Sequence, residues 1–126
     1  MKGSLQIIIG LNNNFMDIHT DGSGKTGNYA YVVERSNKVR VFRKIGATNN
    51  EAEYLGVIAA LKENSGTDIH IHSDSQLIVN QLNHEYAIKE ERLRKLAEEV
   101  WKLAEGRNVT FSWLPREKNK AGKVLG

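Results

Sequence analysis

The chain has 126 residues, which is about the size of one domain and too short for two sizeable hydrophobic cores. It contains no cysteine, which excludes disulfide bonds and thiolate metal sites and is compatible with a reducing cytoplasm. Its net charge of +3 is weak evidence for a polyanionic partner, and no apolar run reaches membrane-spanning length, so we expect a cytoplasmic protein with no membrane partner.

Residues 1–15 are expected to be an N-terminal extension or an expression remnant. An apolar patch in this segment is followed by three consecutive asparagines, and Met16 offers a natural start after them. No repeat or linker interrupts the remainder of the chain, so we assign residues 16–126 to one domain.

Three strands are predicted first. Residues 16–21 alternate between polar and apolar side chains, which places Asp17, His19 and Asp21 on one face of a strand. Two further segments are rich in β-branched and aromatic residues and are joined by Ser36 and Asn37, which indicates an antiparallel hairpin. These segments are residues 28–34 and 38–44.

Helices and strands then alternate. The predicted elements are a helix from Thr48 to about Lys62, a strand over 67–73, a helix from Asp74 to about Leu82, a helix over 89–104 and a strand over 108–114. The two tryptophans, Trp101 and Trp113, fall at positions typical of a core. The order β-β-β-α-β-α-α-β predicts an α/β fold with a mixed sheet, antiparallel at first and then returned through helices.

Two glutamates lie close together near the start of the first predicted helix. Glu51 follows Thr48 by three residues, the spacing of a capping box in which the glutamate reaches back to the start of the helix, and we prefer this explanation of Glu51. Glu53 lies beyond the free N–H groups of the first turn and among mostly apolar neighbours. A buried carboxylate requires a cation or several donors; taken alone, Glu53 is more readily explained by an arginine or lysine partner than by a metal ion.

Two aspartates each end a predicted strand. Asp21 precedes a glycine turn, and Asp74 lies between Ser73 and Gln76, which have the spacing of a second capping box. Each residue has a local explanation, but together with Glu53 they can converge on one crevice. Hard oxygen ligands of this kind suit Mg²⁺ or Mn²⁺ rather than zinc. The sequence permits this convergence without showing it.

Four segments, in this order and at this spacing, resemble the motifs of the type 1 ribonuclease H family. They are TDGSG at 20–24, TNNEAEY at 48–54, SDSQLIV at 73–79 and WLPREKNK at 113–120. The resemblance covers nearly the whole chain from residue 16. It is to the compact branch of the family, because the segment between Leu82 and Leu93 is too short for the basic handle helix of longer members.

The resemblance implies a five-stranded mixed sheet flanked by helices, and an enzyme that cuts the RNA strand of RNA–DNA hybrids with two Mg²⁺ ions. By matching position, Asp21, Glu53 and Asp74 correspond to metal-binding catalytic carboxylates. The positions of Thr48, Asn49, Asn50 and Gln76 match residues that contact the hybrid. In this chemistry one ion activates a water and the other stabilises the leaving oxygen, as in-line displacement requires.

The resemblance breaks at the fourth acidic position, where this sequence has Lys123. A lysine there would oppose a divalent cation if both were confined together. The sequence also leaves little length for the family's C-terminal helix. Two hypotheses of function therefore stay open: a hybrid-specific ribonuclease with impaired activity, or a nucleic-acid-binding module of the same fold that has lost cleavage. A third alternative is that the ending at residues 122–126 is not native and that a longer natural chain carries the acid. We expect a monomer in either case.

Overall fold

The computed structural model describes residues 15–126, so the predicted extension lies almost entirely outside the described residues. Its strands are β1 (Phe15–Gly22), β2 (Asn28–Val33), β3 (Lys38–Arg43), β4 (Asp68–Ser73) and β5 (Asn108–Trp113). Its helices are α2 (Asn49–Glu63), α3 (Gln76–Leu82), α4 (Glu91–Ala104), the short 3₁₀ helix η1 (Arg116–Lys118) and α5 (Lys120–Leu125). The sheet thus begins at Phe15, one residue before the predicted domain start. Among the described residues, no helix has the length and apolar character needed to cross a bilayer.

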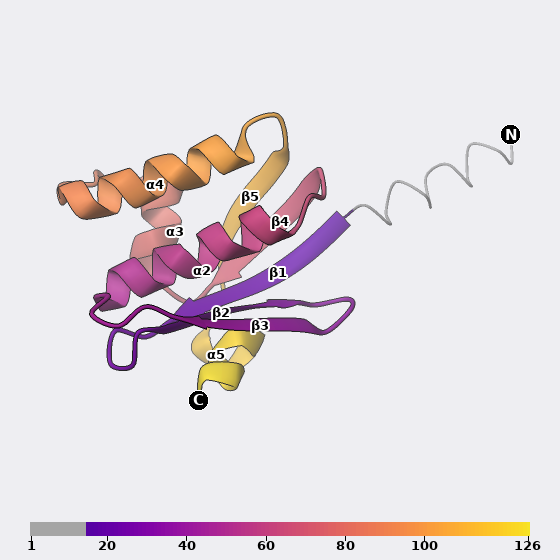
Figure 1. Cartoon of the computed structure of the whole chain (residues 1–126). Coiled ribbons are helices and arrows are strands. Elements are labelled where there is room, and N and C mark those ends of the chain that lie inside the picture. Colours follow the sequence, from indigo (N-terminus) through magenta and orange to yellow (C-terminus); the bar gives the residue numbers. More distant parts are fainter. Residues whose placement is uncertain (1–14) are drawn as a thin grey trace, which may run out of the picture.

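The five strands form one mixed sheet in the order β3-β2-β1-β4-β5 (Figure 1). β1 pairs antiparallel with β2, and β2 with β3, as the predicted hairpin requires. β4 pairs parallel with both β1 and β5, because each of these connections returns through helices. The predicted fold class is confirmed.

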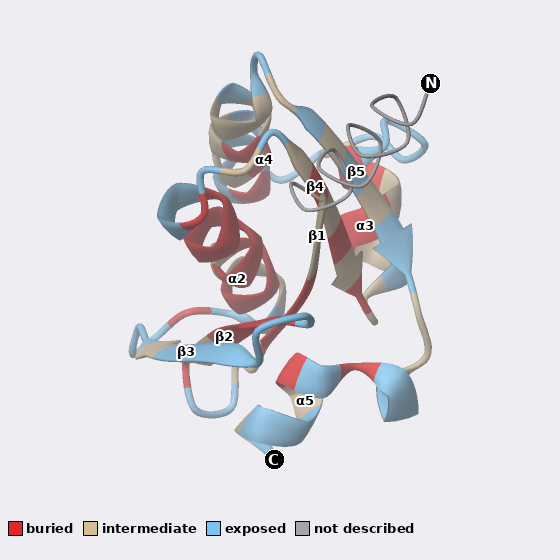
Figure 2. Cartoon of the chain, turned by 90° about the vertical axis from the view of Figure 1, so that its right-hand side faces the viewer, coloured by how far each residue is buried: buried red, intermediate tan, exposed pale blue. Residues whose placement is uncertain are grey.

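The helices cover the two faces of this sheet unequally. α2 packs against β1 and β2 on one face with α4 beside it, while the short α5 lies against β1 and β2 on the opposite face (Figures 1 and 2). α4 carries a strongly one-sided apolar stripe that is buried at Leu93, Ala97 and Val100, which matches its predicted period. This packing holds the carboxyl ends of β1 and β4 beside the first turns of α2.

Isoleucines on the two central strands form the middle of the core. Ile18, Ile69 and Ile71 are buried against apolar residues of α2 such as Val57. Their burial fixes the register of the sheet, because shifting either strand by one residue would move these side chains to the opposite face. The register in turn determines which residues leave the sheet at its carboxyl edge.

The start of α3 and the C-terminal helix differ from what the sequence led us to expect. α3 begins at Gln76, and its N-cap is Ser75, whose hydroxyl accepts from the N–H of Ile78 at 3.2 Å. Ser73 instead accepts from the N–H of Ser75, so the capping box predicted from Ser73 was wrong. Asp74 therefore stands between β4 and α3, outside the capping interactions. The C-terminal helix, for which we expected too little length, forms as α5.

Gly22 allows α2 to lie directly against the end of β1. A Cβ atom on Gly22 would come within 2.2 Å of the backbone carbon of Ala52, which no side chain can tolerate. The absence of a side chain thus brings the start of α2 against β1 next to Asp21. This close approach is what places Glu53 near the carboxyl end of the strand.

Candidate active site

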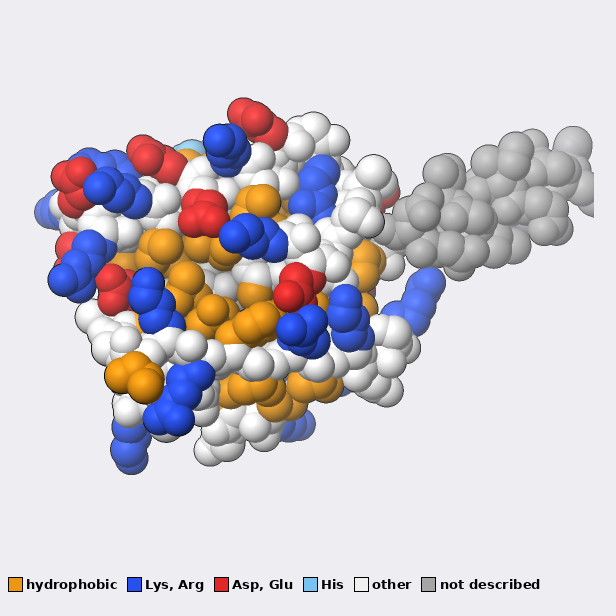
Figure 3. Space-filling view, in the orientation of Figure 1, with side chains coloured by type: hydrophobic (Ala, Val, Ile, Leu, Met, Phe, Trp, Pro, Cys, Tyr) orange, Lys and Arg blue, Asp and Glu red, His pale blue; other side chains and the backbone are white. Residues whose placement is uncertain are grey.

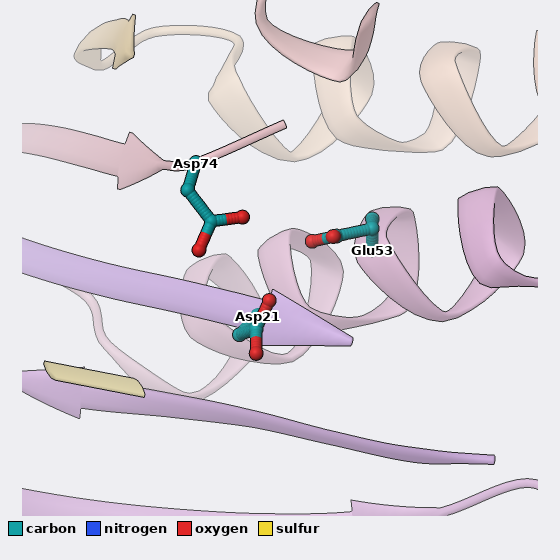
Figure 4. A group of neighbouring side chains, drawn as sticks. All are labelled: Asp21, Glu53 and Asp74. Atoms are coloured by element: carbon teal, nitrogen blue, oxygen red, sulfur yellow. The ribbon is translucent and has the colours of Figure 1, made fainter. Parts of the chain in front are cut away.

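Three carboxylates meet at the carboxyl ends of the central strands (Figure 4). Asp21 comes from the end of β1, Asp74 follows β4, and Glu53 projects from α2. The parallel register pairs Thr20 with Ser73, so the next residue on each strand leaves at the same edge of the sheet. One carboxylate oxygen from each of the three residues lies within 4.8 Å of the others. The convergence that the sequence permitted is present.

Two of these carboxylates are buried with little compensation from the protein. Asp21 is 3% exposed and Glu53 is 8% exposed, and one oxygen of each has no hydrogen-bond partner. Burial, and then the charge of Asp74, raise the pKa of Asp21 to about 6. Burial, and then the charges of Asp21 and Asp74, raise the pKa of Glu53 to about 9. The arginine or lysine partner that Glu53 alone suggested is not found among the described residues.

Asp74 differs because three side chains surround it. The amide of Asn119 donates to its Oδ2 at 3.1 Å, and the guanidinium of Arg116 lies 3.9 Å from the same oxygen. The indole N–H of Trp113 donates to its backbone carbonyl at 3.1 Å. The prediction that Trp113 belongs to the core was wrong: it is 47% exposed and flanks the site, whereas Trp101 packs against the protein and donates to the carbonyl of Leu82.

Asn119 joins α5 to the carboxylates, and the sequence analysis gave it no role. It is fully buried; besides Asp74, its amide donates to the carbonyl of Thr20 at 2.9 Å. Its side-chain oxygen caps α5 by accepting from the N–H groups of Ala121 and Gly122. The pattern of an asparagine one residue before a short helix is an N-cap signal that was available in the sequence. Its other two partners, Thr20 and Asp74, lie 99 and 45 positions away in the chain.

α5 approaches the carboxylates with Gly122, and the next residue, Lys123, is exposed. A Cβ atom on Gly122 would lie 3.5 Å from Oδ2 of Asp21 and 3.7 Å from Oδ2 of Asp74. The cation whose charge lowers the pKa of Asp21 and Glu53 is Arg116. Arg116 is the second site residue that the sequence analysis did not assign.

Two of the three carboxylates open into a cleft of about 400 Å³. Asp21 and Glu53 line it together with Asn49, Lys25 and Arg116. Asn49 also accepts from the N–H of Gly24 at 2.7 Å, which ties the loop after β1 to the start of α2. Of the four residues predicted to contact a hybrid, only this one lies in the cleft lining among the described residues.

The other three predicted contact residues lie at the starts of helices. The Thr48 hydroxyl accepts from the N–H of Glu51, whose carboxylate accepts from the N–H of Thr48, so the predicted capping box is confirmed. Asn50 is half-buried in the first turn of α2, and Gln76 is exposed in the first turn of α3. The roles of these residues toward a hybrid stay predictions.

Comparison with known proteins places this chain in a family. The family model described as reverse transcriptase-like matches residues 20–125, which is most of the chain. The bifunctional protein Rv2228c of Mycobacterium tuberculosis is 36% identical over 77 residues, covering 58% of this chain and 21% of its own length. The chain thus spans about a fifth of that relative.

Solved structures agree over a larger part of the chain. The N-terminal ribonuclease H domain of Rv2228c is 28% identical with a TM-score of 0.73, covering 88% of this chain and 89% of that one. Ribonuclease H1 of Halobacterium salinarum is 26% identical with a TM-score of 0.76, covering 87% and 92%. LC11-RNase H1, solved with an RNA/DNA hybrid, is 26% identical with a TM-score of 0.76, covering 88% and 99%. The chain therefore belongs to the reverse transcriptase-like family of ribonuclease H-like proteins.

Proposed function

We propose that the protein is a metal-dependent endonuclease that cleaves the RNA strand of RNA–DNA hybrids. The observation that carries this proposal is the convergence of Asp21, Glu53 and Asp74 within 4.8 Å, with two buried oxygens that no protein group satisfies. Three carboxylates held this close repel one another, and a structural role would be served better by neutral side chains. A bound divalent cation removes the conflict.

The residues fit Mg²⁺ or Mn²⁺. Carboxylate oxygens are the ligands these hard cations prefer, and no cysteine is present to favour a softer metal. Asp21, Glu53 and Asp74 would hold the metal, with the unsatisfied oxygens of Asp21 and Glu53 as ligands. Bound there, a divalent cation supplies the Lewis acidity and the charge neutralisation that hydrolysis of a phosphodiester requires.

The protein's own groups then position the carboxylates and the substrate. Asn119 donates to Asp74 and holds one of its oxygens in place, which leaves the other oriented for a ligand. Arg116 sits at the rim with its side chain mostly exposed, where its charge attracts the backbone phosphate of an entering strand. The amide of Asn49 lies in the cleft, where it contacts the sugar and the groove edges of the substrate. The 2′-hydroxyl of the sugar is the group by which a protein distinguishes RNA from DNA.

A second candidate function is hybrid binding without cleavage. The observation that favours hybrid binding alone is Lys123, which stands where the ribonuclease H family has its fourth acidic residue. Only three acidic residues meet in the described part of the chain. The two candidates predict the same binding surface and differ in turnover.

One experiment separates them. A 5′-labelled RNA–DNA hybrid is incubated with the protein in Mg²⁺ and in Mn²⁺, beside Asp21→Asn, Glu53→Gln and Lys123→Asp variants. We expect the wild-type protein to cleave the RNA strand, and we expect the Asp21→Asn and Glu53→Gln variants not to cleave it. Single-stranded RNA and duplex DNA of the same sequence serve as control substrates.

The outcomes point in different directions. Tight hybrid binding with no cleavage, and activity that emerges in Lys123→Asp, would establish the binding module instead. Cleavage that persists in Asp21→Asn at equal protein concentration would remove the carboxylates from the mechanism. If the wild-type protein neither binds nor cleaves the hybrid, both candidate functions are wrong.

A further inference from the structure

A histidine is buried where α5 covers the sheet. The face formed by α2 and α4 carries its lysine, arginine and acidic side chains at the surface, where the two signs of charge are mixed (Figure 3). His19 of β1 is instead only 5% exposed and lies on the opposite face of the sheet, against the start of α5 (Figure 2). A buried imidazole needs hydrogen-bond partners for its ring nitrogens. The partners of His19 therefore indicate its role.

The two ring nitrogens of His19 have different partners. Nδ1 accepts from the backbone N–H of Lys120, the first residue of α5, at 3.0 Å. Nε2 lies 3.2 Å from Oε2 of Glu34. Because Nδ1 accepts, it carries no proton, so the proton of the neutral ring is on Nε2 and is donated to the Glu34 carboxylate. The same carboxylate oxygen lies 3.8 Å from Nζ of Lys120. His19 thus joins β1 to the start of α5 in one defined tautomer.

His19 completes the helix cap that Asn119 begins. The side-chain oxygen of Asn119 accepts from the N–H groups of Ala121 and Gly122, and its backbone carbonyl accepts from the next N–H group of the helix. The N–H of Lys120 is the one donor at this helix start that the cap leaves over, and His19 accepts from it. The first turn of α5 therefore depends on a side chain from a strand about 100 positions earlier in the chain.

The start of α5 is attached to β1 at two neighbouring points. The amide of Asn119 donates to the carbonyl of Thr20 at 2.9 Å, and the N–H of Lys120 donates to His19. One bond alone would leave this short helix free to turn about it, whereas two bonds fix its direction. The Asn119 amide also donates to Oδ2 of Asp74 at 3.1 Å. A turn of the helix start would therefore move this donor away from the carboxylate.

We propose that His19 is a positioning residue for the carboxylate of Asp74, and that it acts through the start of α5. Its Nδ1 holds the backbone of Lys120, and the adjacent Asn119 then holds Asp74. The role requires no contact between His19 and a substrate or metal ion. This inference rests on the proposed function, because it names a residue outside the cleft on which the geometry of the carboxylates depends.

Two substitutions of similar shape test the role of Nδ1. In His19→Asn, a side-chain oxygen takes the place of Nδ1 and can accept from the N–H of Lys120. In His19→Leu, a methyl group occupies that place and accepts nothing. Both variants lose the bond to Glu34, so they differ in the acceptor. The matched control is Lys120→Gln, which removes the ion pair with Glu34 and keeps the backbone N–H.

The first readout needs neither metal nor substrate. The side-chain amide of Asn119 is held by Thr20 and Asp74, and its hydrogen exchange can be followed by NMR. We expect exchange about tenfold or more faster than wild type in His19→Leu, because the helix start opens more often. Exchange in His19→Asn and in Lys120→Gln should stay close to that of the wild type.

Metal binding and cleavage provide two further readouts. Calorimetric titration with Mn²⁺ should give a Kd raised about tenfold in His19→Leu, as is typical when a partner of a metal ligand is lost. With the labelled hybrid, the same variant should lower kcat about tenfold and change KM little, because a carboxylate moves and the binding surface does not. His19→Asn should recover most of both losses.

The comparison of variants decides the inference. Equal results for His19→Asn and His19→Leu, with both proteins folded in urea titrations, would show that His19 acts only by packing and would overturn it. A loss in Lys120→Gln as large as that in His19→Leu would also overturn it, because the ion pair would then hold the helix. His19→Gln, whose amide reaches Glu34 and leaves no acceptor at the place of Nδ1, replaces His19→Leu if that protein does not fold.

Failure of the proposed function gives a different pattern. If the wild-type protein neither binds Mn²⁺ nor cleaves the hybrid, the proposed function is wrong. Exchange of the Asn119 amide then decides whether His19 holds α5 beside Asp74. Fast exchange in His19→Leu and slow exchange in His19→Asn would support that role, and equal exchange in the two variants would exclude it.

Discussion

Glu53 is a buried carboxyl group whose position cannot be explained by packing. It is almost fully buried on a helix whose buried face is otherwise mostly apolar, and its charge is opposed by two further carboxylates. A side chain in that position weakens the fold unless something binds it. Stability is commonly given up in this way where an active site stores unfavourable electrostatics.

We expect Glu53→Gln to stabilise the protein when divalent cations are removed. The folded state holds the proton of Glu53 up to a pKa of about 9, above the ordinary glutamate value of 4.5. The contribution of this group to the free energy of unfolding is therefore fully present below pH 4.5 and is lost as the pH rises toward 9. At pH 8 in EDTA, the variant should gain about 1–3 kcal/mol in the free energy of unfolding, measured with urea.

The control for that substitution is Glu98→Gln on the exposed side of α4. It removes the same charge without relieving burial and should change the free energy of unfolding little. The gain in Glu53→Gln should also shrink at pH 5, because this pH is close to the ordinary glutamate pKa of 4.5 and the carboxyl is then partly protonated in the unfolded chain as well. A gain that is absent at pH 8, or equal at both pH values, would show that the buried charge of Glu53 does not weaken the fold.

At the scale of elements, the site depends on two contacts between elements far apart in the chain. α2 meets β1 at Gly22, and α5 meets β1 and Asp74 through Asn119. α5 has six residues, too few to be stable as an isolated helix, so its cap and its packing must hold it. The buried Ala121 and the capping asparagine provide both.

We expect Asn119→Ala to destabilise the protein by about 2–3 kcal/mol, because it removes an N-cap and leaves the carbonyl of Thr20 buried without its partner. Asn83→Ala is the matched control, since its amide also donates to a backbone carbonyl, that of Phe111, but at the surface. Urea unfolding of both variants should show a clearly smaller loss for Asn83→Ala. Equal losses would mean that Asn119 acts as an ordinary surface amide.

Gly22→Ala tests the approach of α2 to β1. A methyl group there overlaps the backbone of Ala52, so the helix must move away from the strand. We expect a loss of about 2–4 kcal/mol and lower hybrid cleavage, because Glu53 moves with the helix. Gly56→Ala, whose Cβ atom would meet the carbonyl of Asp21 at 3.0 Å, should cost less. A Gly22→Ala protein with wild-type stability would show that α2 shifts freely.

At the scale of the whole molecule, the sheet acts as the frame that brings the acidic groups together, and a cation bound there would link several elements. Residues of β1, α2 and the β4–α3 connection would share one ligand. Binding to the folded state alone raises its stability in proportion to the logarithm of ligand concentration. The unfolded chain cannot offer the three oxygens at once.

We expect Mn²⁺ or Mg²⁺ to raise the unfolding temperature of the wild-type protein. The rise should be larger at pH 8 than at pH 5.5, because protons compete for Asp21 and Glu53, whose pKa values are raised to about 6 and about 9. Differential scanning calorimetry against metal concentration measures the effect, with Asp21→Asn as the control that should respond least. A rise of the same size in Asp21→Asn would place the metal elsewhere.

Much of the fold could be predicted from the sequence because its signals are local. Alternation marked β1 and β4, a period of 3.6 marked α4, and the capping box marked the start of α2. Errors came where two local signals competed. Ser73 and Ser75 are both able to cap α3, and only the turn after β4 selects Ser75. Trp113 lies on the edge strand β5, where burial depends on which helices cover it.

By itself, the sequence determined the order of the elements, the strand faces and the three acidic positions, because hydrophobic period and turn chemistry act over a few residues. Only the tertiary structure decided that Asp21, Glu53 and Asp74 share one site, that Asn119 and Arg116 adjoin it, and that His19 bonds to the start of α5. These contacts join residues tens of positions apart. Their distances follow from how the helices pack on the sheet, which no local pattern records.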